Sequence, residues 1–309
     1  MLHSRLTRLT LCFSATLVVG CASNSAARRA TIITDADRAA KAVLERENAI
    51  DVAKIPARAF AVVPFTMSAR DTLLEPLAFG LPALLANDLA VSPELQLVER
   101  VQLAAMLREL KLVDDGIVDP RQAPRVGRLV GARRLLIGTV SRSNDNTIRL
   151  NVRVVDVLSG TVQEVAAAEA PINRVLDAEK ALALLIFERL GITLTPAQRV
   201  RVEERQTTQL AALVAFGRGV ESDAKGDWSG ATKAYQEATQ LDGKFVAART
   251  SKVLAAVAPH PRVTNLERVL GFSAQALNMP VPTKTTEVAD APLASSSGFS
   301  LIFIIRVTP

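Results

Sequence analysis

The sequence predicts an α/β domain with a mixed sheet, followed by an α-helical hairpin. Between residues 57 and 195, apolar strand-like runs alternate with amphipathic helical patterns, which is typical of βα units. Later in this region two strand patterns follow one another across a turn, which indicates an antiparallel part of the sheet. Between residues 196 and 260, small and aromatic residues recur at helical spacing. The 309 residues are enough for about two domains.

Each element of the expected sheet domain has a local signature. The run "RAFAVVPF" (58–65) is apolar and stops at Pro64, as a buried strand does. Residues 100–112 form an amphipathic helical pattern, and residues 147–157 alternate apolar and polar side chains as a half-buried strand does. In chain order we expect helix 34–50, strand 58–65, helix 74–90, strand 95–99, helices 100–112 and 120–131, strands 133–143, 147–157 and 161–170, and helix 173–191.

The first twenty residues have the pattern of an export signal. Arg5 and Arg8 precede an apolar run at 9–19. This run of about eleven residues is too short to span a bilayer, which takes roughly 20, and it fits the apolar part of a secretory signal.

The signal ends in a motif that resembles a bacterial lipobox, formed by Val18, Val19 and Gly20 directly before Cys21. The resemblance implies cleavage before Cys21 and lipidation of its sulfur. Ala22 follows Cys21, which in that family favours the outer membrane, with the chain facing the periplasm. Two or more acyl chains are needed for stable attachment.

The remaining composition excludes several chemistries. Cys12 and His3 leave with the signal and Cys21 is consumed by lipid, so His260 is the last imidazole and no thiol remains. A nucleophilic triad or a His/Cys zinc site therefore lacks its residues, and we expect no catalytic residue, no metal and no cofactor. The positive charge is mild and aromatic residues are 4% of the chain, so we expect no nucleic-acid partner.

Four segments in a fixed order resemble the periplasmic domain of the curli-secretion lipoprotein family (CsgG/HfaB type), which is related to the N-terminal domain of TolB and to a flagellar outer-membrane lipoprotein. They are "AVVPF", "LVERVQLAAMLRELKL", "VGARRLLIGTV" and "LNVRVVDVLSGTV". The positions that match the family are Glu99, Arg100, Leu103, Gly131, Ala132, Asp156, Ser159 and Gly160. The likeness spans residues 58 to 191.

From the residues themselves, Glu99 and Arg100 are interpreted as a strand-to-helix junction with a local ion pair or cap. Asp156 and Gly160 are interpreted as hairpin turn residues. The resemblance implies a secretion channel as one function. The family's pore hairpins fall where this chain has "SRSNDN" and after residue 170, and neither place has room for membrane strands of about ten residues each.

Residues 212–245 resemble a tetratricopeptide repeat (TPR). Gly219 stands where the partner helix crosses closely. The small, aromatic and small positions of the second helix are Ala231, Tyr235 and Ala238. A next helix is expected at 245–258. Because one repeat cannot bury its own apolar face, the hairpin must dock on the sheet domain, on another subunit or on a partner.

These patterns divide the chain into five segments: signal peptide 1–20, lipidated tether and N-terminal helix 21–56, sheet domain 57–195, TPR-like helical segment 196–260, and a C-terminal helix, linker and β-prone tail 261–309.

The function expected from the sequence is a non-enzymatic outer-membrane lipoprotein that assembles or scaffolds envelope components. Its partners would be the inner leaflet of the outer membrane, other envelope proteins or peptides, and further copies of the chain in a homo-oligomer. The first alternative is a CsgG-type channel that secretes extracellular fibre or adhesin subunits. The second is a hydrolase acting through paired carboxylates. Its candidate residues are Asp114, Asp115, Asp156 and Glu164.

Overall fold

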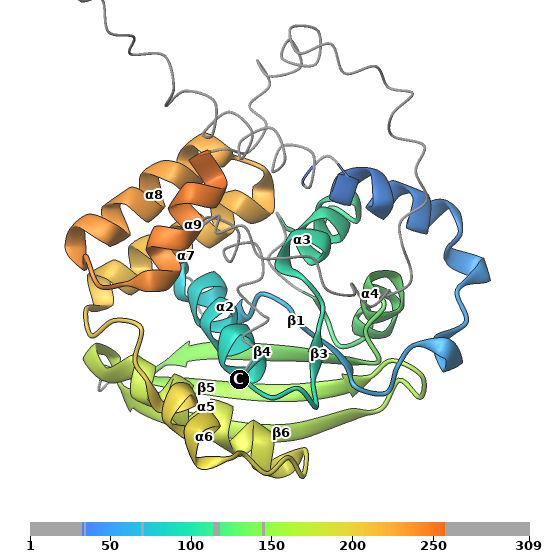
Figure 1. Cartoon of the computed structure of the whole chain (residues 1–309), viewed down its shortest axis with the longest axis horizontal. Coiled ribbons are helices and arrows are strands. Elements are labelled where there is room, and N and C mark those ends of the chain that lie inside the picture. The colour runs from blue at the N-terminus through green and yellow to red at the C-terminus, as the bar shows by residue number, and fades with distance from the viewer. Residues whose placement is uncertain (1–32, 34, 69–70, 114–117, 144–145, 257–309) are drawn as a thin grey trace, which may run out of the picture.

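The strands of the described residues form one mixed sheet, which lies in the lower half of Figure 1. The computed structural model describes residues 33, 35–68, 71–113, 118–143 and 146–256. The strand order is β3-β1-β4-β5-β6, with β2 pairing with β4; β1 pairs in parallel with β3 and β4, whereas β4, β5 and β6 are antiparallel. The bounds are β1 Ala59–Val62, β2 Thr66–Met67, β3 Gln96–Leu97, β4 Arg134–Arg142, β5 Thr147–Asp156 and β6 Val162–Pro171. The predicted mixed sheet is confirmed; the short strand β2 was not predicted.

The predicted helices occur in the predicted order, with ends that differ by a few residues, and α6 is a further helix that was not predicted individually. Residues 35–45 are helical. The α-helices are α2 Leu77–Leu89, α3 Arg100–Glu109, α4 Ala123–Val130, α5 Val175–Arg189, α6 Pro196–Glu203, α7 Leu210–Lys225, α8 Trp228–Leu241 and α9 Val246–Ala256. The 3-10 helices are η1 Glu47–Ala49, η2 Val52–Lys54 and η3 Ile172–Arg174. The predicted helical region after the sheet is confirmed.

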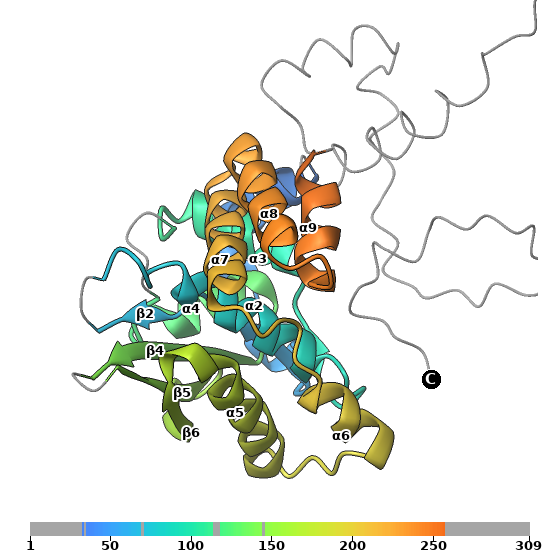
Figure 2. The same ribbon diagram turned by 90° about the vertical axis from the view of Figure 1, so that its left-hand side faces the viewer.

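The core of the sheet domain lies between the sheet and two helices. The alternating side chains Ile148, Leu150, Val152 and Val154 of β5 are all buried. Helices α2 and α5 contact each other and the sheet, and α5 runs along β5 and β6 (Figure 2). The apolar face predicted from the period-2 pattern is therefore the face that these helices cover.

Helices α7, α8 and α9, coloured in shades of orange in both views, pack together above α2 and beside α3 (Figures 1 and 2). We call residues 59–189 the sheet unit and residues 210–256 the helical unit. The turn between α7 and α8 is local: Gly226 ends α7 with a φ of 78°, and the side chain of Asp227 accepts a hydrogen bond from the amide of Gly230.

The helical unit docks on the sheet unit where α7 crosses α2. A Cβ atom built on Gly217 would lie 2.1 Å from the carbonyl oxygen of Pro76, and one built on Gly80 would lie 3.1 Å from the Cα of Gly217. No side chain fits between the two helices at this point. Of the three docking surfaces left open by the sequence, the structure uses the sheet domain.

Candidate functional site

A charged cluster joins the two units on the side of α3. The Nη2 atom of Arg100 lies 3.6 Å from Oδ2 of Asp223 on α7 and 3.5 Å from the hydroxyl oxygen of Ser251 on α9. The hydroxyl of Tyr235 on α8 donates a hydrogen bond of 2.5 Å to the same oxygen of Asp223. Arg100 therefore connects the first turn of α3 to all three helices of the helical unit.

The pKa of the Asp223 carboxyl lies well above the usual range of an aspartate. Burial raises its pKa from 3.8 to about 6, although the charges of Arg100 and Arg108 and the hydrogen bond from Tyr235 all act to lower it. Burial and the charge of Asp223 also raise the pKa of Tyr235 well above its usual value, so this hydroxyl stays protonated and remains a donor.

Arg108, near the end of α3, closes the C-terminal end of α7. Its Nη1 atom lies 3.1 Å from the carbonyl oxygen of Ala224 and 3.4 Å from that of Asp223, and its Nη2 atom pairs with Asp37. The guanidinium also lies 5.6 Å from the ring centroid of Trp228. Since the last carbonyls of a helix have no partner within the helix, Arg108 supplies donors that α7 itself lacks.

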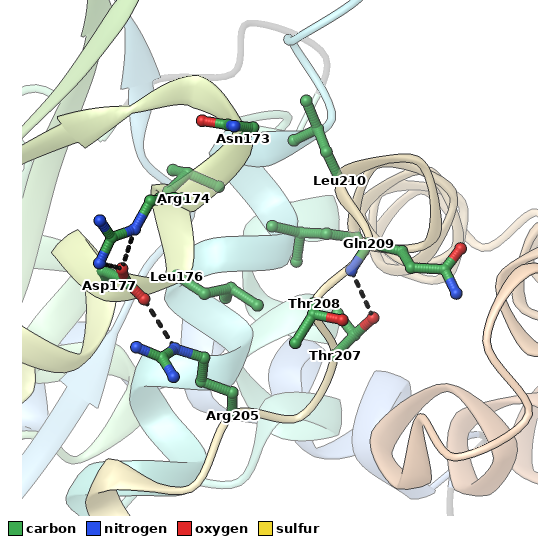
Figure 3. A pocket seen from close by; sticks show the side chains of 11 residues that line it. Asn173, Arg174, Leu176, Asp177, Arg205, Thr207, Thr208, Gln209 and Leu210 are labelled. Carbon is green, nitrogen blue, oxygen red and sulfur yellow. Dashed lines mark hydrogen bonds and ion pairs between the residues drawn. The ribbon is translucent and has the colours of Figure 1, made fainter.

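A pocket of about 270 Å³ opens on another side of the junction (Figure 3). Three pieces of chain form it: the entry to α5, the segment 204–209 that joins α6 to α7, and the first turn of α7. We call it the junction pocket. Its lining residues are Asn173, Arg174, Val175, Leu176, Asp177, Arg205, Thr207, Thr208, Gln209, Leu210 and Leu213.

One carboxylate holds two arginines at the junction pocket. Arg174 Nε donates to Oδ2 of Asp177 and Arg205 Nε donates to Oδ1, each at 2.6 Å, as Figure 3 shows. Burial raises the pKa of Asp177, but the two arginines outweigh it and the pKa lies below its usual value. Asp177 is therefore ionised at neutral pH and orients both guanidinium groups.

A second set of hydrogen bonds anchors the segment 204–209 to the helical unit. The hydroxyl of Thr207 donates to Oδ2 of Asp242 at 2.7 Å and accepts from the amide of Gln209 at 3.1 Å. Arg205 ties the other end of this segment to α5 through Asp177. The wall of the junction pocket is thus fastened to both units.

The structure brings two of the sequence-predicted groups together. Arg100, from the family-like motif, and Tyr235, from the repeat-like motif, both contact Asp223. Glu99 is the residue before α3, and its side chain accepts no capping hydrogen bond. The ion pair of Arg100 is thus made with Asp223 across the junction and differs from the local pair or cap expected at residues 99 and 100.

The other motif residues that the structure describes form a turn or pack against neighbouring side chains. Asp156 accepts hydrogen bonds from the amides of Leu158 and Ser159 in the β5–β6 turn, where Gly160 has a φ of 70°. A Cβ atom on Gly219 would lie 2.4 Å from the ring of Tyr235. The alanines Ala231 and Ala238 are fully buried.

Other predicted positions lie outside the described residues. They are the lipobox Val18, Val19 and Gly20, the lipidation site Cys21, His260, the carboxylates Asp114 and Asp115, and the segments 1–32 and 261–309.

Sequence reasoning did not single out Gly80, Gly217, Arg108, Asp177 or Arg205. The two glycines carried a usable signal, since a glycine inside a helical pattern commonly has a packing reason. The charged residues carried none, because nothing in their local spacing distinguishes them from solvated surface residues.

No helix in the described ranges has both the length and the apolar character needed to cross a membrane. Within the same ranges, no group of three or more histidine, cysteine or acidic side chains has a geometry that could hold a metal ion.

Comparisons with known proteins bear on the sheet unit. Two solved structures have local likeness to part of this chain. The LpoB C-terminal domain from Salmonella enterica is 21% identical, with 38% of this chain and 84% of that chain covered and a TM-score of 0.28. The NMR structure of E. coli LpoB is 22% identical, with 36% and 57% covered and a TM-score of 0.28. A likeness with identities and TM-scores this low implies nothing about function.

No curated protein sequence matches the chain. A family model does: "Curli production assembly/transport component CsgG" matches residues 54–147, from η2 through β4 to the first residue of β5. The resemblance predicted from the four segments is confirmed over this range, which includes Glu99 and Arg100 but not the β5–β6 turn or the helical unit. Residues 54–147 of this chain are a CsgG domain.

Proposed function

We propose that this protein is a non-enzymatic lipoprotein that assembles or scaffolds components of the bacterial envelope through protein–protein contacts. A CsgG-like envelope domain forms the first part of the sheet unit. A lipid on Cys21 would hold the chain at the inner leaflet of the outer membrane, facing the periplasm. The TPR-like helical unit would receive a peptide or a neighbouring protein.

The observation that carries this proposal is the way the CsgG domain and the helical unit are joined. Glycine-to-glycine contact and the charged cluster link them, so that the two units present one continuous surface with the junction pocket in it. A rigid joint of this kind suits a protein that holds partners in a set geometry.

Asp156, one of the carboxylates considered for hydrolysis, stabilises the turn between β5 and β6. Asp156 accepts three hydrogen bonds from its own turn, from the amides of Leu158 and Ser159 and from the hydroxyl of Ser159. This arrangement supports a turn-forming role for Asp156.

Photo-crosslinking in intact outer membranes tests the scaffolding role. A benzophenone amino acid placed at Gln209, beside the junction pocket, is expected to give discrete adducts with envelope proteins. The matched control places it at Arg121, whose side chain is 89% exposed and does not line the junction pocket. Adducts at Gln209 should disappear in the Cys21→Ala variant, because the chain would leave the membrane. Identical adduct patterns at both positions, or none at either, would contradict the proposal.

A CsgG-type secretion channel is the second candidate, favoured by the description of the matching family. Planar-bilayer recordings of the detergent-extracted protein distinguish the two functions. Reproducible conductance steps from a purified oligomer would support the channel, whereas silent bilayers together with specific crosslinks would support the scaffold.

A further inference from the structure

We propose that the junction pocket binds a peptide segment of a partner protein that carries a carboxylate next to a bulky apolar side chain. The inference rests on the proposed function, because it names the partner chemistry for that contact. The junction pocket lies beyond residues 54–147 and so belongs to this chain's own architecture.

The inner part of the junction pocket is apolar. Val175 and Leu176 at the start of α5 and Leu213 on α7 are all buried, yet they line the opening. A dry cavity of about 150 Å³ can already hold a ring the size of benzene. The volume of about 270 Å³ therefore has room for one bulky apolar side chain and a short length of main chain.

The outer part of the junction pocket carries unbalanced positive charge. Its lining includes two arginines but a single carboxylate, Asp177. Arg205 binds Asp177 through Nε, and within the described part of the chain its two Nη atoms make no hydrogen bond. The side chain of Arg205 lines the junction pocket and is 49% exposed, so these donors are open to solvent.

The orientation of Arg205 favours a carboxylate ligand. A guanidinium binds a carboxylate best through two parallel N–H donors, and the free Nη pair of Arg205 keeps that geometry. Asp177 fixes the arginine through Nε and so reduces the entropy lost when a ligand binds. Exposed polar side chains at Asn173 and Thr208 can bond the main chain of a peptide, and Figure 3 shows them around the apolar floor.

The ligand is accordingly a peptide in which the apolar side chain fills the floor and the carboxylate reaches Arg205. The carboxylate can be the chain end of the partner or the side chain of a neighbouring acidic residue. Both have the same chemistry, and suitable probes distinguish them.

Methyl NMR on the full chain in detergent micelles, with labelled leucine and valine, tests this inference. The probes are N-acetyl-leucine, which has a main-chain carboxylate, and acetyl-leucyl-aspartic acid α-amide, in which only the side-chain carboxylate is free. N-acetyl-leucinamide is the uncharged control. Either acid should shift the methyl signals of Val175, Leu176 and Leu213, and which acid does so identifies the source of the carboxylate. The control should bind about tenfold more weakly, because it lacks the charge-assisted hydrogen bonds.

Two variants sharpen the test. Arg205→Gln should weaken binding of the acids about tenfold and leave that of N-acetyl-leucinamide unchanged, which also shows that the pocket is intact. Arg121→Gln, on an exposed arginine that does not line the junction pocket, should change neither. Equal affinity for acid and amide, shifts confined to other methyl groups, or an unaffected Arg205→Gln variant would overturn the inference. Because the purified chain is tested without any envelope partner, failure here is separate from failure of the crosslinking experiment.

Discussion

The helical unit is attached to the sheet unit by two contacts of opposite chemistry. At the α2–α7 crossing, Gly80 and Gly217 let two helix backbones touch, and no charge is involved. At the α3 contact, Arg100 and Arg108 meet the carboxylate of Asp223 and the end of α7. The first contact sets how closely the helices approach and tolerates no added atom. The second depends on ionisation, so it alone should respond to pH.

The largest effect is expected at the glycine crossing. Gly217→Ala places a methyl group 2.1 Å from the carbonyl oxygen of Pro76, and only a shift of a whole helix can relieve that contact. We expect a loss of about 3 kcal/mol in the free energy of unfolding, measured in urea. The control is Gly243→Ala, where the nearest atom is 4.0 Å away and the change should be within about 0.5 kcal/mol. Similar values for the two variants would mean that the crossing is not tight.

The charged contact should lose stability as pH rises. The folded-state pKa of Asp223, about 6, lies above its ordinary value of 3.8, so the folded chain binds this proton more tightly than the unfolded chain. The stabilisation is complete below about pH 4 and is lost as pH rises through 6, by roughly 2–3 kcal/mol. Asp223→Asn should remove this component of the pH dependence. The comparison is made from urea unfolding of both proteins between pH 4 and pH 8; parallel curves would contradict the assignment.

A smaller effect is expected inside the helical unit. Gly219→Ala brings a methyl group 2.4 Å from the ring of Tyr235, at a cost of about 2 kcal/mol. Here the obstacle is a side chain, so the cost should fall by about half when Tyr235→Leu is also present. A double-mutant cycle measures this difference. Strictly additive changes would show that Gly219 is needed for a reason other than the ring.

The smallest effect is expected at Arg108. Arg108→Lys keeps the charge but loses the planar group that reaches two carbonyl oxygens and Asp37 while lying near Trp228. We expect a loss of about 1 kcal/mol. The matched control is Arg121→Lys, at an exposed pair with Asp119, where no measurable change is expected. If both variants lowered the temperature of thermal unfolding equally, the contacts of Arg108 would not stabilise the fold more than an exposed ion pair does.

The sequence could predict those residues of the candidate site that belong to a recognisable motif. Gly219 and Tyr235 could be found from the TPR-like motif, and Arg100 could be found from the family-like motif. Asp223 could not, because a single acidic residue near the end of a helix resembles any solvated one. The junction pocket was equally hidden: Asp177 and Arg205 are 28 residues apart, and only the path of α5 and α6 brings them together.

The sequence by itself determined most of the elements, their order and the mixed character of the sheet. Periodicity and turn residues are local properties, and one apolar face per strand or helix is enough to define them. Only the tertiary structure decided what the helical unit docks on, which residue pairs with Arg100, and where a pocket opens. These depend on contacts between α3, α5 and α7, whose physical cause is shape and charge complementarity between surfaces that no local pattern records.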